Sequence, residues 1–180
     1  MIRPLGERGR QWRRTAIVAA LVLAVVVGWG TYLHARSTPD YRLGAPGAAV
    51  DPDPDGLAPM RLLSLEVTDS LSTDRESVPA PAGAVWVAAV VGYDPLPENR
   101  VCTLALLADD GRRWSASTPL DVGVSGSRPL TAGCLTPGDD RRSEFLYLVP
   151  ATAAGSLAGL VHANTGYRGL APYWVLTPPG

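Results

Sequence analysis

The sequence is poor in the side chains that most enzymes use for acid–base and metal chemistry. Its 180 residues include two His, two Cys and no Lys, so all sixteen basic residues are Arg. His162 is the only His after residue 34, which removes most nucleophile–base pairs from that part of the chain. One His and two Cys also fall short of the four ligands of a structural zinc site. Phosphate-loop and dinucleotide fingerprints are absent. We therefore expect no catalytic residue, no cofactor and no metal.

Charge is distributed unevenly along the chain. Residues 1–36 hold six Arg and one acid, a net of +5, whereas residues 37–180 hold ten Arg and sixteen acids, a net of −6. The two sums return the overall charge of −1. Binding to a polyanion needs clustered positive charge. We therefore expect the C-terminal part not to bind nucleic acid.

One uncharged stretch is long enough to cross a lipid bilayer. Residues 15–33 are nineteen residues without a charge, and as a helix they span roughly 28 Å, close to the ~30 Å hydrocarbon thickness. Five Arg precede the stretch, so the positive-inside rule predicts a cytoplasmic tail at 1–14 and an extracytoplasmic C-terminal side. The residues that flank the predicted span and fit this orientation are Arg10, Arg13, Arg14, Trp29 and Tyr32.

A cleaved signal peptide is the alternative to a retained anchor. Residues 16–27 alone could form the apolar core of a signal peptide. A small residue should then stand at position −3 of the cleavage site, but Leu33 occupies that position for a cut after Ala35. We interpret the segment as a retained anchor, and cleavage stays open.

Residues 34–59 have the composition of a linker. From residue 37 to 59 they include five Pro interleaved with Gly and Asp, too little apolar surface to offset the entropy of ordering. Such a stretch stays semi-extended and acts as a spacer. The alternating Asp and Pro of residues 51–55 could suggest calcium, but calcium needs converging oxygen ligands and Pro holds these carboxylates apart.

Residues 60–180 show short apolar runs broken by Pro, Gly and Asp, with no sustained helical period, which predicts an all-β domain. Residues 61–68 alternate between apolar and polar side chains, and residues 84–91 are apolar on both faces, as in a central strand. Asp109, Asp110 and Gly111 provide the residues of a hairpin turn. About seven strands in this length predict an immunoglobulin-like β sandwich. The expected strands are 61–68, 84–91, 101–108, 112–118, 144–149, 157–163 and 173–176.

The two cysteines both lie in the part of the chain predicted to be exported. Oxidising compartments favour pairing of Cys102 with Cys134. Closing that loop of about 33 residues would contribute on the order of 3–4 kcal/mol in the chain-entropy model. Two buried free thiols are the alternative, since no Cys-x-x-Cys motif indicates redox chemistry.

Three further features have a functional and a structural interpretation. Residues 123–127 (Gly-Val-Ser-Gly-Ser) approach the nucleophile turn of serine hydrolases but lack its final Gly, so we expect a loop. The adjacent acids at 109–110 and 139–140 suit turns better than a glycosidase cleft. The Arg pairs at 112–113 and 141–142 could form a basic patch for anionic lipid or polymer, although surface strand charge is the simpler interpretation.

The domain resembles a group of immunoglobulin-like ectodomains of unknown function found in lipoproteins and membrane-anchored surface proteins of Gram-positive bacteria. Three segments carry the resemblance: Leu65–Leu71 (LEVTDSL), Ala108–Trp114 (ADDGRRW) and Pro137–Pro150 (PGDDRRSEFLYLVP). One departure is the Gly92-Tyr93-Asp94-Pro95 sequence, where the group has an Asn-Gly or Asn-Asp turn. The resemblance implies fold and surface location, and it implies no reaction.

These observations favour a non-catalytic protein of the cell envelope. We expect a single-pass membrane protein whose outer domain binds or assembles with another envelope protein, of unknown identity. The alternative is an ectodomain that senses or binds a ligand or a cell-wall polymer. A hydrolase is disfavoured because positioned acid–base groups are absent.

Overall fold

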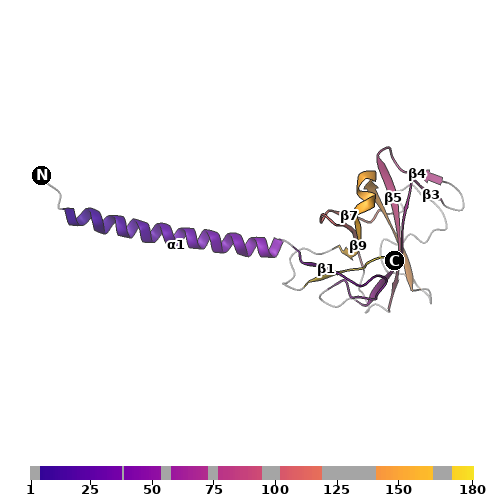
Figure 1. The fold of residues 1–180 in the computed structure, drawn as a ribbon, viewed down its shortest axis with the longest axis horizontal. Helices are drawn as coiled ribbons and strands as arrows, with labels where there is room; N and C mark the ends of the chain where they lie inside the picture. Colours follow the sequence, from indigo (N-terminus) through magenta and orange to yellow (C-terminus); the bar gives the residue numbers. More distant parts are fainter. Residues whose placement is uncertain are drawn as a thin grey trace. The chain divides into compact units, whose positions relative to one another are not determined.

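The computed structural model describes residues 5–37, 39–53, 58–72, 77–94, 102–118, 141–163 and 172–180 (Figure 1). The chain divides into two compact units, Met1–Pro39 and Asp40–Gly180. The first unit is helical and the second is built mainly of strands. The expectation of one N-terminal helix followed by a β-rich domain is therefore confirmed.

Helix α1 (Leu5–Ser37) contains the predicted span and extends beyond it at both ends. Within α1, the segment from Trp12 to His34 is long and apolar enough to cross a membrane, a test that a signal sequence also meets, and none of it is buried. Apolar side chains on all sides of the helix are exposed, including Ile17 at 60% and Leu23 at 65%. The length and composition of this helix are compatible with a single membrane span.

The predicted flanking residues of α1 lie in a regular helix. Arg13 and Arg14 are exposed, and the side chain of Arg10 lies outside the described residues. The Trp29 and Tyr32 rings lie one turn apart and are in tilted contact, with centroids 5.8 Å apart. These positions are those expected at the ends of an apolar span.

Two three-stranded antiparallel sheets form the centre of the second unit. One has the order β2 (Met60–Thr68), β5 (Ala84–Tyr93), β8 (Arg142–Pro150). The other has the order β7 (Arg113–Ser115), β6 (Leu104–Ala108), β9 (Leu157–His162). A bridge between Ser117 and Leu146 links the two sheets. The 3-10 helix η1 (Ala151–Ser156) joins β8 to β9, and its Ala151 N–H donates to the carbonyl of Gly83 over 2.9 Å.

Apolar side chains from both sheets form one core. The alternate residues of β5 that begin at Val85 point into this core, because successive side chains of a strand lie on opposite faces of the sheet. Tyr147 is fully buried there, and its hydroxyl donates a 3.1 Å hydrogen bond to the carbonyl of Leu104 on the other sheet. Burial raises the pKa of Tyr147 well above its usual value. The fully buried residues of this core include Met60, Leu62, Val87, Val91, Leu106, Phe145, Tyr147 and Leu160.

The outer faces of the two sheets are covered by short strands. The hairpin of β3 (Ser70–Ser72) and β4 (Ser77–Pro79) places Leu71 against Trp86. On the other sheet, β1 (Tyr41–Leu43) and β10 (Tyr173–Val175) pair in parallel, and β10 packs Val175 against Val161. Strand β5, whose residues Ala84–Val91 are apolar on both faces, is therefore covered on both sides, as expected.

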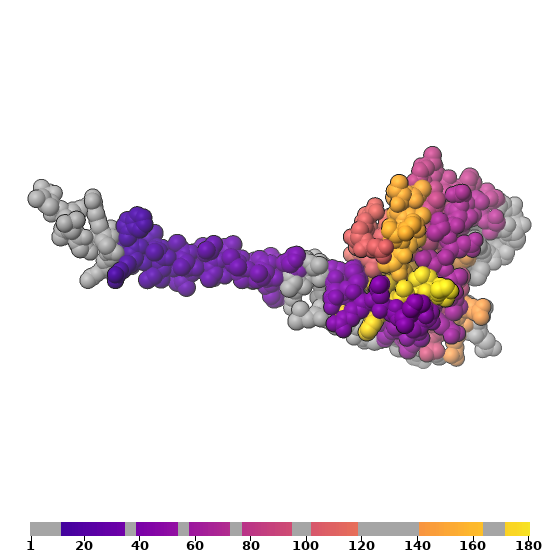
Figure 2. Space-filling view, viewed as in Figure 1, coloured from indigo at the N-terminus to yellow at the C-terminus, as the bar shows by residue number. Residues whose placement is uncertain are grey.

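The predicted linker at 34–59 differs from the structure. Residues 34–37 continue α1, and the second unit begins at Asp40 rather than at residue 60. Strand β1 pairs with β10, Gly44 N–H donates to the carbonyl of Val175 over 3.0 Å, and Val50 pairs with Met60. Figure 2 shows this early segment in purple against the yellow C-terminal residues. The composition of this segment does not favour an ordered structure. Its order comes from pairing with residues near the C-terminal end of the chain.

The longer strands agree with the sequence prediction, whereas three of the five described three-residue strands were not predicted. Strands β2, β5, β8 and β9 match the expected ranges closely, and β6, β7 and β10 are shorter than or shifted from theirs. Strands β1, β3 and β4 have three residues each, too few for a periodic pattern. Phe145 and Trp86 are both buried, at 1% and 5% exposure.

Candidate binding groove

A groove of about 530 Å³ opens at the end of the sheet where β2 begins and β5 ends. Three of its lining side chains are guanidinium groups, from Arg61, Arg141 and Arg142. All three are exposed. The other described residues that line it are Ala49, Pro59, Leu63, Gly92, Tyr93 and Asp94.

Strand register brings the arginines together. Arg61 on β2 lies opposite Gly92 on β5, and Gly92 lies opposite Arg142 on β8, so the three residues form one row across the sheet. Residues opposite each other share a face, so two Arg flank a residue that has no side chain. With strands ~4.8 Å apart, the two Arg backbones are roughly 10 Å apart.

Gly92 is the floor of the groove. A Cβ at this position would meet Leu63 Cδ1 at 3.3 Å and Arg61 Nε at 3.5 Å. The absence of a side chain therefore lets the Arg61 and Leu63 side chains lie over β5. A larger residue would displace the Arg61 side chain from the row.

Backbone hydrogen bonds fix the groove end of the sheet. Tyr93 N–H donates to the carbonyl of Arg141 over 3.1 Å, and Asp94 N–H donates to the carbonyl of Pro59 over 3.2 Å. These bonds hold the residues before β8 and before β2 to the end of β5. The groove is thus carried on a rigid sheet end.

The groove is positive in a unit that is acidic overall. Its described lining holds three of the ten Arg between residues 37 and 180 and one acid, Asp94. Planar guanidinium groups bind carboxylate or phosphate oxygens in pairs. The arrangement is suited to holding an anionic group.

The other residues singled out by sequence are not brought together. Among the described residues, no group of three His, Cys, Asp or Glu is placed to hold a metal ion. His162 is buried at the end of β9, opposite Leu104. Residues 123–127 and 139–140 lie outside the described ranges.

Cys102 is fully buried in the core and is not a free thiol. Cys134 lies outside the described ranges. The pairing of Cys102 with Cys134 therefore stays a prediction.

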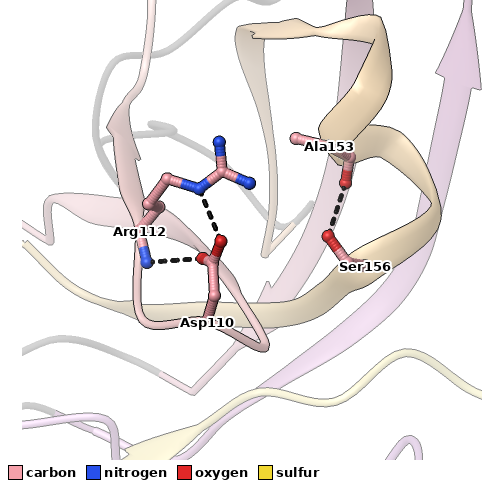
Figure 3. A network of polar contacts seen from close by, with 4 residues as sticks. All are labelled: Asp110, Arg112, Ala153 and Ser156. Carbon is pink, nitrogen blue, oxygen red and sulfur yellow. Dashed lines mark hydrogen bonds and ion pairs between the residues drawn. The ribbon is translucent and has the colours of Figure 1, made fainter.

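The expected hairpin turn at residues 109–111 is confirmed (Figure 3). Gly111 has a φ of 83°, and strands β6 and β7 pair on either side of it. Asp110 accepts hydrogen bonds from Arg112 N–H at 3.0 Å and from Arg112 Nε–H at 2.7 Å. The backbone N–H of Arg112, helped by its guanidinium, holds the pKa of Asp110 below its usual value. Nearby, Ser156 hydroxyl donates to the carbonyl of Ala153 over 3.1 Å within η1.

Sequence reasoning identified part of the groove. The 141–142 pair is a potential basic patch by sequence, with surface strand charge as the simpler interpretation. Arg61 and Gly92 were missed as partners because only the register of β2, β5 and β8 places them in one row. The one local signal was Gly92 itself, a Gly at the end of a buried apolar strand.

Comparison with protein-family models, with curated proteins and with solved structures found no match for this chain.

Proposed function

We propose that this chain is a single-pass membrane protein whose outer domain is a non-catalytic binding or assembly module for another cell-envelope protein. The observation that carries the proposal is the groove with three Arg in an otherwise acidic unit. An anionic partner surface is attracted by the positive groove and repelled by the rest of the acidic domain. These charges therefore direct such a partner to the groove.

The exposed apolar helix supports the anchoring part of the proposal. The segment Trp12–His34 has no buried residue, and the Arg-rich N-terminal end favours a cytoplasmic side for residues 1–14. In this proposal the β-rich unit is an extracytoplasmic immunoglobulin-like sandwich stapled by Cys102 and Cys134. Its similarity to ectodomains of Gram-positive surface proteins stands as part of the same proposal.

Charge reversal in the groove tests the function. The full-length chain is cross-linked in its native membrane and purified in mild detergent, as wild type and as the Arg61→Glu, Arg141→Glu double variant. We expect a co-purifying envelope protein whose yield falls at least tenfold in the double variant. The matched control is Arg113→Glu, which reverses an exposed Arg on β7 of the other sheet. Recovery of the chain alone, or equal loss in both variants, would contradict the proposal.

The groove also fits the alternative of an anionic wall polymer, since guanidinium groups bind phosphate and carboxylate alike. This alternative predicts that polymer fragments raise the melting temperature of the wild-type chain and leave that of the double variant unchanged. No such shift is expected if the partner is a protein.

Topology is tested separately. External protease added to wall-stripped cells should release the β-rich unit, and a non-reducing gel should show no alkylated thiol. Protection of the unit together with two reactive thiols would overturn the membrane orientation and the disulfide.

A further inference from the structure

Within the described part of the chain, β2 is an edge strand whose outer side is open over most of its length. The sheet order is β2, β5, β8, so β5 pairs with one side of β2. On the other side, the described residues contribute only the bridge between Val50 and Met60. Alternate residues of an antiparallel edge strand direct their N–H and C=O groups away from the sheet. Between Ser64 and Val67 these groups face no other strand of the described chain.

The inner face of the same edge is incompletely covered. Leu65 and Val67 lie opposite Ala89 and Val87, which are both fully buried in the core. Val67 is nevertheless 44% exposed and Leu65 is half-buried. The apolar core therefore reaches the surface at β2, where an added strand would cover it.

The groove lies at the start of this open edge. Arg61 and Leu63 of β2 line it, and Val50 occupies the pairing position beside Met60. A strand that pairs along β2 must therefore end or turn away beside Arg61. Glu66 is exposed at the other end of the open stretch. Charge along the edge thus favours a negative group near Arg61 and disfavours one near Glu66.

We infer that the open edge of β2 accepts an extended segment of the partner protein as an added strand, with a carboxylate of that segment bound by Arg61 in the groove. Main-chain hydrogen bonds would hold the segment, and alternate apolar side chains would cover Leu65 and Val67. The carboxylate is either an Asp or Glu side chain or the C-terminus of the partner. This inference rests on the proposed function and names the chemistry of its partner.

A second copy of the chain is a less suitable occupant. Antiparallel pairing of two β2 strands would place Glu66 of one copy opposite Arg61 of the other, which satisfies the charges. Residues beyond Glu66 would then meet the position that Val50 already occupies at Met60. The partner segment avoids this conflict because it can end at the groove.

Site-specific cross-linking tests the inference on the full chain in its native membrane. A photoreactive residue replaces Val67, and the matched control replaces Ser115, which is exposed on β7 of the other sheet. We expect a cross-linked product from position 67 only, and we expect Arg61→Glu to reduce its yield at least fivefold. Mass spectrometry should place the cross-link in a short segment of another protein that includes an acidic residue or the C-terminus.

Synthetic peptides of the cross-linked segment then identify the carboxylate. Amidation of the C-terminus and Asp→Asn or Glu→Gln replacement are compared, and one of them should weaken binding to the wild-type chain about tenfold. If neither change weakens binding, the carboxylate is not recognised and the inference is wrong.

The other outcomes are equally informative. A cross-link to β2 of a second chain would show that the open edge mediates self-association, and the inferred partner segment would then be wrong. If the groove variants lose the partner while position 67 gives no product, the proposed function holds and strand addition is wrong. If no partner is recovered in any form, both fail.

Discussion

The chain that begins at Met60 should be much less stable than the chain that begins at Asp40. Both lack the helix, and they differ in residues 40–59, which have the composition of a linker yet include β1. Among the described residues they give or receive seven hydrogen bonds with residues 60–180, besides those of the β1–β10 pairing. They include Gly47 N–H to the carbonyl of Thr177 at 3.1 Å and Thr177 hydroxyl to the carbonyl of Gly44 at 2.6 Å.

The size of the loss follows from these contacts. A typical hydrogen bond contributes ~0.5–1.5 kcal/mol net, and some lost partners are replaced by water, so we expect a loss of about 3–6 kcal/mol. Removal of β1 also uncovers Tyr173 and Val175, which are 5% and 0% exposed. The loss is a large share of the 5–15 kcal/mol typical of a domain and should lower the melting temperature on the order of 10–20 °C.

Thermal and urea unfolding of the two oxidised, purified chains measures this difference. Gly44→Ala in the longer chain is an independent check, because the added Cβ would lie 3.0 Å from the carbonyl oxygen of Val175. It should shift stability in the same direction by a smaller amount. Melting temperatures that agree within about 3 °C would show that residues 40–59 are a spacer after all.

Three further predictions concern single side chains. Gly159→Ala should lower the free energy of unfolding by about 3 kcal/mol or more, measured by urea unfolding, because φ is 142° and a Cβ would overlap the carbonyl oxygen of Leu176. The control Gly83→Ala, with a φ of 80° and open space around it, should lower it by about 1 kcal/mol. Equal losses in the two variants would refute the argument. Tyr147→Phe should cost about 1 kcal/mol at neutral pH through its lost hydrogen bond. Because burial raises the pKa of Tyr147 in the folded chain, this phenol ionises above pH ~10 only in the unfolded chain. The stability advantage of the wild type over Tyr147→Phe should therefore shrink as the pH rises above ~10. A stability difference that stays constant with pH would contradict the burial of Tyr147. In an NMR titration Asp110 should show a pKa below 3.8. Arg112→Gln should raise this pKa only part of the way back to its usual value, because the backbone N–H of residue 112 still donates to the carboxylate. A full return to the usual value would assign the effect to the guanidinium alone.

The strands that carry long alternating or continuous apolar patterns could be predicted from the sequence. Residues 61–68 and 84–91 show their burial in their spacing, and Asp110 with Gly111 marks the turn of the hairpin formed by β6 and β7. The helix could also be predicted, because an uncharged stretch of nineteen residues is typical of a helix that crosses a membrane. In these segments local pattern and tertiary environment agree.

The remaining elements depend on partners that are distant in sequence. Strand β1 looks like linker because Pro and Gly surround it, and its order comes from β10. The groove is similar: no local pattern relates Arg61 to Arg142, since their proximity results from the pairing of both strands with β5. Register between distant strands is what single-sequence reasoning did not supply.

The parallel pairing of β1 with β10 also has a consequence for biogenesis. Gly44 and Thr177, which bond to each other, are 133 positions apart, so the residues just after the helix have no partner until nearly all of the chain has been synthesised. Contacts of such long sequence separation form late and slowly. A nascent chain stalled before Tyr173 would leave β1 without its pairing strand, and chaperones and proteases act on such unpaired strands.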